Sequence, residues 1–176
     1  MKNNPCILPR VLALIVAAIA ILGFFLPYIS IDADYIGYLE TYGEEAELGD
    51  VNVKISDMKE LSLFEYSKIY YYGGEALFGY AEAGWENALA FALPCAAAVV
   101  ILIFAACNCA TPIVLFSAAM AVAMHIVNSF VVSIGVMPSD YAVWGISHLL
   151  YYICAAALFA LGIWLFVAKR RRKKSY

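Results

Sequence analysis

The sequence predicts an all-α membrane protein, a four-helix transmembrane bundle that carries a small mixed α/β extracellular loop domain. Hydrophobic residues make up 65% of the 176 residues and charged residues only 14%, which is far from the balance of a soluble domain. Four apolar runs are each about long enough to cross a bilayer core of roughly 30 Å. The only long polar segment, residues 32–86, holds 13 of the 14 acidic residues. We therefore expect residues 1–176 to form one four-span membrane domain.

The first apolar run predicts a helix over residues 11–31. Its basic start and apolar run are also the features of a signal peptide. We interpret it as an uncleaved anchor, because the run is about 20 residues long and no small-x-small cleavage site precedes the loop. Phe24, Phe25 and Tyr28 are typical of an interfacial aromatic belt, and Pro27 is expected to end the helix.

Residues 32–86 are predicted to be an acidic extracellular loop with its own secondary structure. Val51, Val53 and Ile55 alternate with polar residues, which is the period of a half-buried strand. Asp57 and Glu60 have the spacing of a capping box, so a helix is expected to begin there. This amphipathic helix would lie beside the outer leaflet; a short soluble subdomain fits almost as well.

Further patterns in the loop suggest where the helix ends and what precedes it. Its apolar face would come from Met58, Leu61, Phe64 and Ile69. Gly73 and Gly74 would form its C-cap. Strand-and-turn structure is expected around Tyr35, Gly37, Tyr38, Tyr42 and Gly43.

Three more spanning helices are predicted over residues 87–107, 113–136 and 145–168. Pro94 is expected to kink the first of them, and residues 107–112 form a tight turn. Residues 137–141 make a short second external loop, and residues 169–176 form a basic cytoplasmic tail. Small residues recur at the four-residue spacing of close helix packing: Ala13/Ala17, Ala92/Ala96, Ser117/Ala121, Ala119/Ala123 and Ala156/Ala160.

The distribution of charge predicts the orientation. The net charge is −3, but the loop is strongly acidic, whereas Lys2, Arg10 and the tail are basic. Lysine and arginine near helix ends stay on the cytoplasmic side, so both termini are expected in the cytoplasm of a cell-membrane protein. None of the five cysteines lies in the loop, which favours free thiols over a disulfide scaffold.

No sequence pattern predicts catalysis, a cofactor or a metal. The predicted spans contain no Asp, Glu, Lys or Arg, which argues against a pump or transporter acting alone. Their polar exceptions include His125 and Asn128, a candidate intramembrane pair that could bond across helices or line a path. A soft-metal site of Cys95, Cys154 and His125 is conceivable, but the spacing is not diagnostic. Calcium binding by the acidic cluster of residues 40–50 is a further alternative to a solvated face.

Two surfaces are candidates for contact with other molecules. Tyrosine is enriched at protein interfaces, so the first candidate surface consists of Phe64, Tyr70, Tyr71 and Tyr72. The second is expected to anchor the protein and to contact anionic lipid headgroups; it consists of Lys169, Arg170, Arg171, Arg172, Lys173 and Lys174.

The layout of inner termini, long first loop and short second loop resembles that of the claudin-like four-span proteins. The segment Phe24-Phe25-Leu26-Pro27-Tyr28, followed by an acidic loop, is similar to small uncharacterised four-span membrane proteins of Gram-positive bacteria. Both resemblances imply topology only, and neither assigns a functional residue.

The sequence favours a non-enzymatic interaction or scaffold protein whose external loop is its working surface. The alternative is a subunit of a transporter or channel, with His125 and Asn128 lining the path. Besides the lipid bilayer, the expected partner is another membrane or extracellular protein, or a second copy of the chain. The charge pattern gives no reason to expect nucleic acid.

Overall fold

The computed structural model describes residues 5–42, 47–48, 51–52, 59–78, 81–134 and 136–174. The chain divides into two compact units. The helical unit comprises Met1–Gly23, Pro94–Val122 and Leu150–Tyr176, and the mixed unit comprises Phe24–Leu93 and Ala123–Leu149. The described elements, in chain order, are α1 (Ile7–Gly23), β1 (Pro27–Ile31), α2 (Ala33–Tyr42), β2 (Glu47–Leu48), β3 (Val51–Asn52), β4 (Glu60–Ser62), α3 (Leu63–Phe78), α4 (Ala81–Ala106), α5 (Ala110–Ser133), β5 (Ala142–Trp144) and α6 (Ile146–Lys174).

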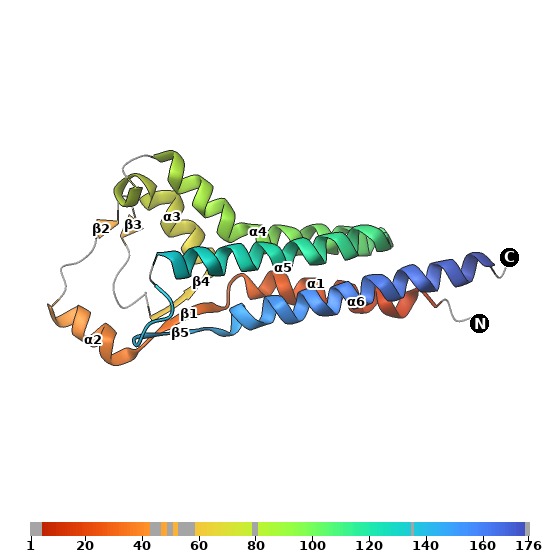
Figure 1. The fold of residues 1–176 in the computed structure, drawn as a ribbon, viewed down its shortest axis with the longest axis horizontal. Helices are drawn as coiled ribbons and strands as arrows, with labels where there is room; N and C mark the ends of the chain where they lie inside the picture. Colours follow the sequence, from red (N-terminus) through yellow and green to blue (C-terminus); the bar gives the residue numbers. More distant parts are fainter. Residues whose placement is uncertain are drawn as a thin grey trace. The chain divides into compact units, whose positions relative to one another are not determined.

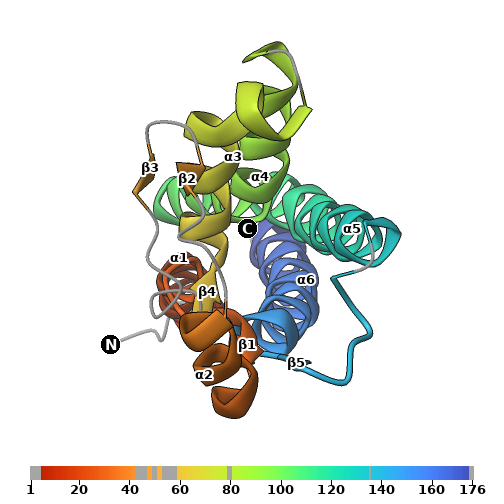
Figure 2. The same ribbon diagram turned by 90° about the vertical axis from the view of Figure 1, so that its left-hand side faces the viewer.

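Four helices contact one another in a cycle within the helical unit (Figures 1 and 2). Arg10 of α1 donates hydrogen bonds to the last carbonyls of α4, 3.2 Å to Ala105 and 2.6 Å to Ala106. The other contacts in the cycle are Phe104 of α4 with Phe116 of α5, Val114 of α5 with Gly162 of α6, and Leu150 of α6 with Gly23 of α1.

Helix α1 buries its small side chains and exposes its large ones. Ala13, Ala17 and Ala20 are buried, whereas Ile15 and Leu22 are exposed, and no large apolar side chain of the helix is fully buried except that of Pro9. A soluble helix would bury the large apolar side chains; the reverse pattern suits lipid surroundings, where small residues allow close helix contact. Ala13/Ala17 is the only one of the five predicted small-residue pairs with both members buried.

Among the described residues, three helices are long and apolar enough to cross a membrane, namely the segments Gly84–Ala106, Ala110–Ser133 and Ile146–Arg172 of α4, α5 and α6. This composition is that of a helical membrane protein. The remaining predicted span, the first in chain order, corresponds to α1. It is shorter than expected, because α1 has 17 residues and is about 25 Å long.

The predicted tight turn between the second and third spans is confirmed. Helix α4 ends at Ala106 and α5 begins at Ala110. Asn108 turns the chain with a φ of 56°, a left-handed conformation that asparagine adopts more readily than most residues. Lys169 of α6 donates a hydrogen bond to the carbonyl of Asn108, so basic side chains satisfy the carboxyl end of α4.

A three-stranded antiparallel sheet of order β4-β1-β5 organises the mixed unit (Figure 1). The central strand β1 pairs Ile29 with Leu61 of β4 and with Trp144 of β5. The prediction of a first helix over residues 11–31 was therefore wrong at its end, since α1 stops at Gly23. The physical reason is Pro27, which cannot continue a helix and is tolerated as the first residue of a strand.

Two further helices of the mixed unit differ from the prediction. Residues 33–42 form α2 rather than strand and turn, because the Asp32 side chain accepts a hydrogen bond from the Asp34 backbone N–H at 2.8 Å and caps the helix. Glu60 lies in β4, so α3 begins later than predicted, and Asp57 lies outside the described residues. Val51 begins β3 as expected, while Val53 and Ile55 are also outside the described part.

The capping box of α3 is Ser62-x-x-Glu65. The Glu65 carboxylate accepts hydrogen bonds from the Ser62 N–H at 2.7 Å and from its hydroxyl at 2.9 Å. The Ser62 oxygen accepts one from the Glu65 N–H at 3.2 Å. The helix then continues through Gly73 and Gly74 to Phe78, so the predicted C-cap at these glycines was wrong.

The boundaries of the remaining spans shift by a few residues. Helix α4 begins at Ala81, and α5 covers Ala110–Ser133 instead of residues 113–136. Helix α6 continues to Lys174 instead of ending at residue 168, because Lys and Arg are good helix formers and favour the carboxyl end of a helix.

Candidate functional site

An aromatic groove lies between α3 and the start of α4 in the mixed unit and encloses about 460 Å³. One face of α3 supplies residues at helical spacing, and α4 supplies three more at the same spacing. The residues that line this aromatic groove are Phe64, Ser67, Lys68, Tyr71 and Tyr72 of α3, and Trp85, Ala88 and Leu89 of α4.

Four aromatic side chains of the groove are exposed. The exposed fraction is 60% for Tyr71, 51% for Tyr72, 47% for Trp85 and 45% for Phe64. Three of them belong to the predicted candidate surface, and the structure brings Trp85 and Leu89 to the same place. The i, i+4 spacing of Trp85 and Leu89 could have indicated this from sequence.

Tyr70 does not belong to the predicted surface. It is only 7% exposed, and its ring stacks on Phe91 at 5.2 Å and meets Phe130 edge-on at 5.7 Å. The correction follows from helix phase. Leu63, Tyr66 and Tyr70 are three and four residues apart and face the core, whereas the groove residues lie on the opposite side of α3.

A cluster of buried aromatic rings supports the groove from below. Tyr66 stacks on Phe91 with ring centroids 5.1 Å apart and meets Tyr28 edge-on at 5.9 Å. Such ring pairs stabilise a fold beyond the area that they bury, by roughly 0.5–1.5 kcal/mol each. The helix that carries the exposed rings is therefore held in place by packed, buried rings on its other face.

Polar bonds fix α3 against its neighbours. The Ser67 hydroxyl donates to the Ala88 carbonyl of α4 at 3.1 Å, and the Phe64 N–H donates to the Phe24 carbonyl at 3.1 Å. Together with the capping box, these bonds set the rotation of α3. The rotation decides which tyrosines reach solvent.

Burial raises the pKa of Tyr66 well above its ordinary value of 10.0, and the neighbouring Tyr70 raises it further. A folded-state pKa above the unfolded value stabilises the fold below about pH 10 and stops doing so as the pH rises, because only the unfolded chain can then lose the proton. We expect the unfolding temperature of the detergent-solubilised protein to fall above about pH 10, and to fall less steeply in Tyr66→Phe. A difference between the two proteins that does not change with pH would contradict this.

The predicted pair of His125 and Asn128 is not brought together. The Asn128 side-chain oxygen accepts a hydrogen bond from the buried Tyr28 hydroxyl at 2.7 Å, so Asn128 ties α5 to β1. His125, three residues earlier, is exposed and makes no hydrogen bond within the described part of the chain.

The basic run divides into residues that line a cavity and residues that do not. Lys169, Arg170 and Arg172 line a cavity of the helical unit, while Arg171 does not. The side chains of Lys173 and Lys174, at the end of α6, lie outside the described part.

The described residues contain no group of three His, Cys, Asp or Glu side chains that could hold a metal ion. All five cysteines are free, as predicted. Most of the acidic cluster proposed for calcium, residues 43–46 and 49–50, lies outside the described part.

Comparison of the chain with known protein families, curated proteins and solved structures found no match. The resemblance to the claudin-like and bacterial four-span proteins therefore stays a prediction.

Proposed function

We propose that the protein is a four-span cell-membrane protein with both termini in the cytoplasm and residues 32–86 outside. The three membrane-length helices and the inverted burial pattern of α1 support this topology. At about 25 Å, α1 is somewhat shorter than a bilayer core of roughly 30 Å, and local thinning of the bilayer accommodates such a difference at modest cost.

We further propose that it is a non-enzymatic interaction or scaffold protein and that the aromatic groove is its docking site. The observation that carries this proposal is the convergence of Phe64, Tyr71, Tyr72 and Trp85 on one groove. Tyr and Trp supply large contact areas at low conformational cost and dominate the energetics of protein interfaces.

The lining indicates which chemistry a partner must present. The apolar lining residues Ala88 and Leu89 suit an apolar side chain, and the tyrosine hydroxyls suit backbone or polar groups. Lys68 adds one cation, which favours a carboxylate on the partner. A segment of another membrane or extracellular protein, or of a second copy of this chain, fits this description.

The double substitution Tyr71→Ala/Tyr72→Ala should weaken the partner complex by more than about tenfold, since truncated interface hot spots each cost roughly 2 kcal/mol or more. The measurement is native mass spectrometry of the protein purified from its own membrane in mild detergent, which shows bound partners and oligomer size. The unfolding temperature should change little, because both rings are exposed.

Tyr141→Ala is the matched control, because Tyr141 is an exposed tyrosine of the mixed unit that lies outside the groove. It should retain the partner. If the groove variant retained the same complex, or if both variants lost it equally, the groove would not be the docking site.

A further inference from the structure

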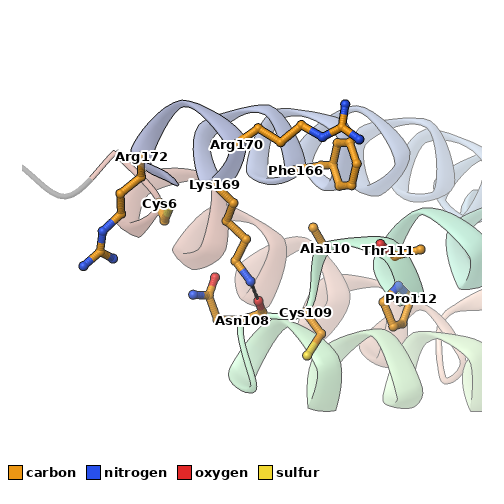
Figure 3. A pocket seen from close by; sticks show the side chains of 10 residues that line it. All are labelled: Cys6, Asn108, Cys109, Ala110, Thr111, Pro112, Phe166, Lys169, Arg170 and Arg172. Carbon is orange, nitrogen blue, oxygen red and sulfur yellow. Dashed lines mark hydrogen bonds between the residues drawn. The ribbon is translucent and has the colours of Figure 1, made fainter. Parts of the chain in front are cut away.

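A second cavity, of about 700 Å³, lies in the helical unit where three chain segments meet (Figure 3). Cys6 approaches from the start of α1, the segment 108–112 from the α4–α5 turn, and Phe166 and the basic residues from α6. In Figure 3, the Lys169 side chain reaches from α6 towards Asn108 across the cavity. The cavity is thus bounded by helix ends.

The charge of this cavity is not balanced within the helical unit. Lys169, Arg170 and Arg172 line it, yet the three segments of the helical unit contain no Asp or Glu at all. The Lys169 ammonium group donates a hydrogen bond to the Asn108 carbonyl, and the Arg170 guanidinium lies 4.6 Å from the centre of the Phe166 ring. Arg172 makes no hydrogen bond or ion pair with the described residues.

Two more features of the lining favour an anion. Ala110 and Thr111 begin the 24-residue helix α5, whose first turn holds no acidic residue, so the positive end of its dipole is uncompensated. The Asn108 side-chain oxygen is buried and has no hydrogen-bond partner among the described residues. A carboxamide can be turned over to present its NH₂ group instead, and that group would donate to an anion.

The lining is also amphipathic. Ala110, Pro112 and Phe166 are apolar, and they lie beside the cations at the ends of membrane-length helices. A free phosphate would leave this apolar part uncovered, whereas a phospholipid presents a phosphate and an acyl chain together.

We propose that this cavity binds the phosphate group of an anionic membrane phospholipid. Arg170 and Arg172 are the principal contacts, and Ala110 and Thr111 at the amino end of α5 line the same cavity. The proposal rests on the membrane topology proposed above and is independent of the aromatic groove. The proposal predicts that Arg170 and Arg172 contribute more to lipid binding than Arg171 does. A general electrostatic anchor would predict equal contributions from all three.

The test is a lipid titration of the full-length protein, delipidated in detergent and observed by native mass spectrometry. Phosphatidylglycerol is compared with phosphatidylcholine of the same acyl chains. Phosphatidylglycerol should bind at one saturable site and more tightly than phosphatidylcholine. Arg170→Gln and Arg172→Gln should each weaken it by about fivefold, and the double variant by more than about tenfold.

Arg171→Gln is the control, because it removes the same charge from the adjacent position but does not line the cavity. Its affinity should stay within about twofold of the wild type. Unfolding temperatures close to that of the wild type exclude misfolding of the variants.

Three results would overturn the proposal. Equal losses in all three single variants would indicate a diffuse surface charge, and equal binding of both lipids would indicate an apolar cavity without headgroup recognition. Displacement of phosphatidylglycerol by an equal concentration of inorganic phosphate would show that the cavity takes the soluble anion. The behaviour of the Tyr71→Ala/Tyr72→Ala variant tests the aromatic groove alone, so its result does not affect this lipid proposal.

Discussion

Gly145→Ala is expected to lower the free energy of unfolding by about 3 kcal/mol or more, and no other single substitution proposed for this protein should cost as much. A Cβ at this position would lie 2.3 Å from the carbonyl oxygen of Pro27 and 2.6 Å from its carbon. Both atoms are backbone, so no side chain can move aside. The Gly145 N–H also donates to the Tyr28 carbonyl at 2.8 Å, so any shift of the chain breaks a bond beside β1.

Denaturant or thermal unfolding in detergent measures this effect. Gly37→Ala is the control, because nothing lies within 4 Å of a Cβ there and the residue lies within α2. This control should be neutral or stabilise by about 0.5–1 kcal/mol. Equal stability of Gly145→Ala and the wild type would show that β1 and residue 145 are not packed as described.

Gly162→Ala is expected to destabilise the helical unit by about 1–3 kcal/mol through overpacking. The new methyl group would lie 2.7 Å from Cγ2 of Val114 and 3.1 Å from Cγ2 of Ile113. These two nearest neighbours are side chains, unlike those of Gly145, although the backbone nitrogen of Val114 also lies 3.2 Å from the new methyl group. Adding Val114→Ala to Gly162→Ala should therefore restore part of the lost stability.

The control for this pair is Val114→Ala alone, which should destabilise by removing apolar contacts. The two substitutions should then be non-additive, since they share one contact. Strictly additive losses in the same unfolding measurement would contradict the close approach of α5 and α6.

The membrane character could be predicted from sequence because it depends on composition over long windows. Runs of about 20 apolar residues have few alternatives, and α4, α5 and α6 fall where the runs predicted them to within a few residues. The ends were less predictable. The basic tail continues α6 because charge stops membrane insertion but not helix formation.

The sheet could not be predicted, because its strands are joined only by tertiary contacts. Strand β1 lies at the end of an apolar run, and β5 is a three-residue strand between the predicted loop 137–141 and the predicted span 145–168. Each becomes a strand because the other pairs with it. Glu60 was assigned to a helix for the same reason, since its pairing with Ser30 cannot be inferred from local sequence.

The groove could be predicted only in part. Phe64, Tyr71 and Tyr72 were identified by their chemistry, but the same chemistry placed Tyr70 with them, although the phase of α3 buries it. The Ser62-x-x-Glu65 signal was present and would have set the helix phase correctly. Trp85 was not among the residues of the predicted surface, and only the fold shows that it lines the same groove.

Photo-crosslinking in intact cells tests the proposed docking site most directly. A benzophenone amino acid replaces Tyr72 inside the groove or, as the control, Tyr141 outside it. We expect illumination to give one discrete protein adduct from position 72 and none from position 141. Adducts with lipid alone from position 72, or the same protein adduct from both positions, would show that the aromatic groove is part of the membrane interface and not a docking site.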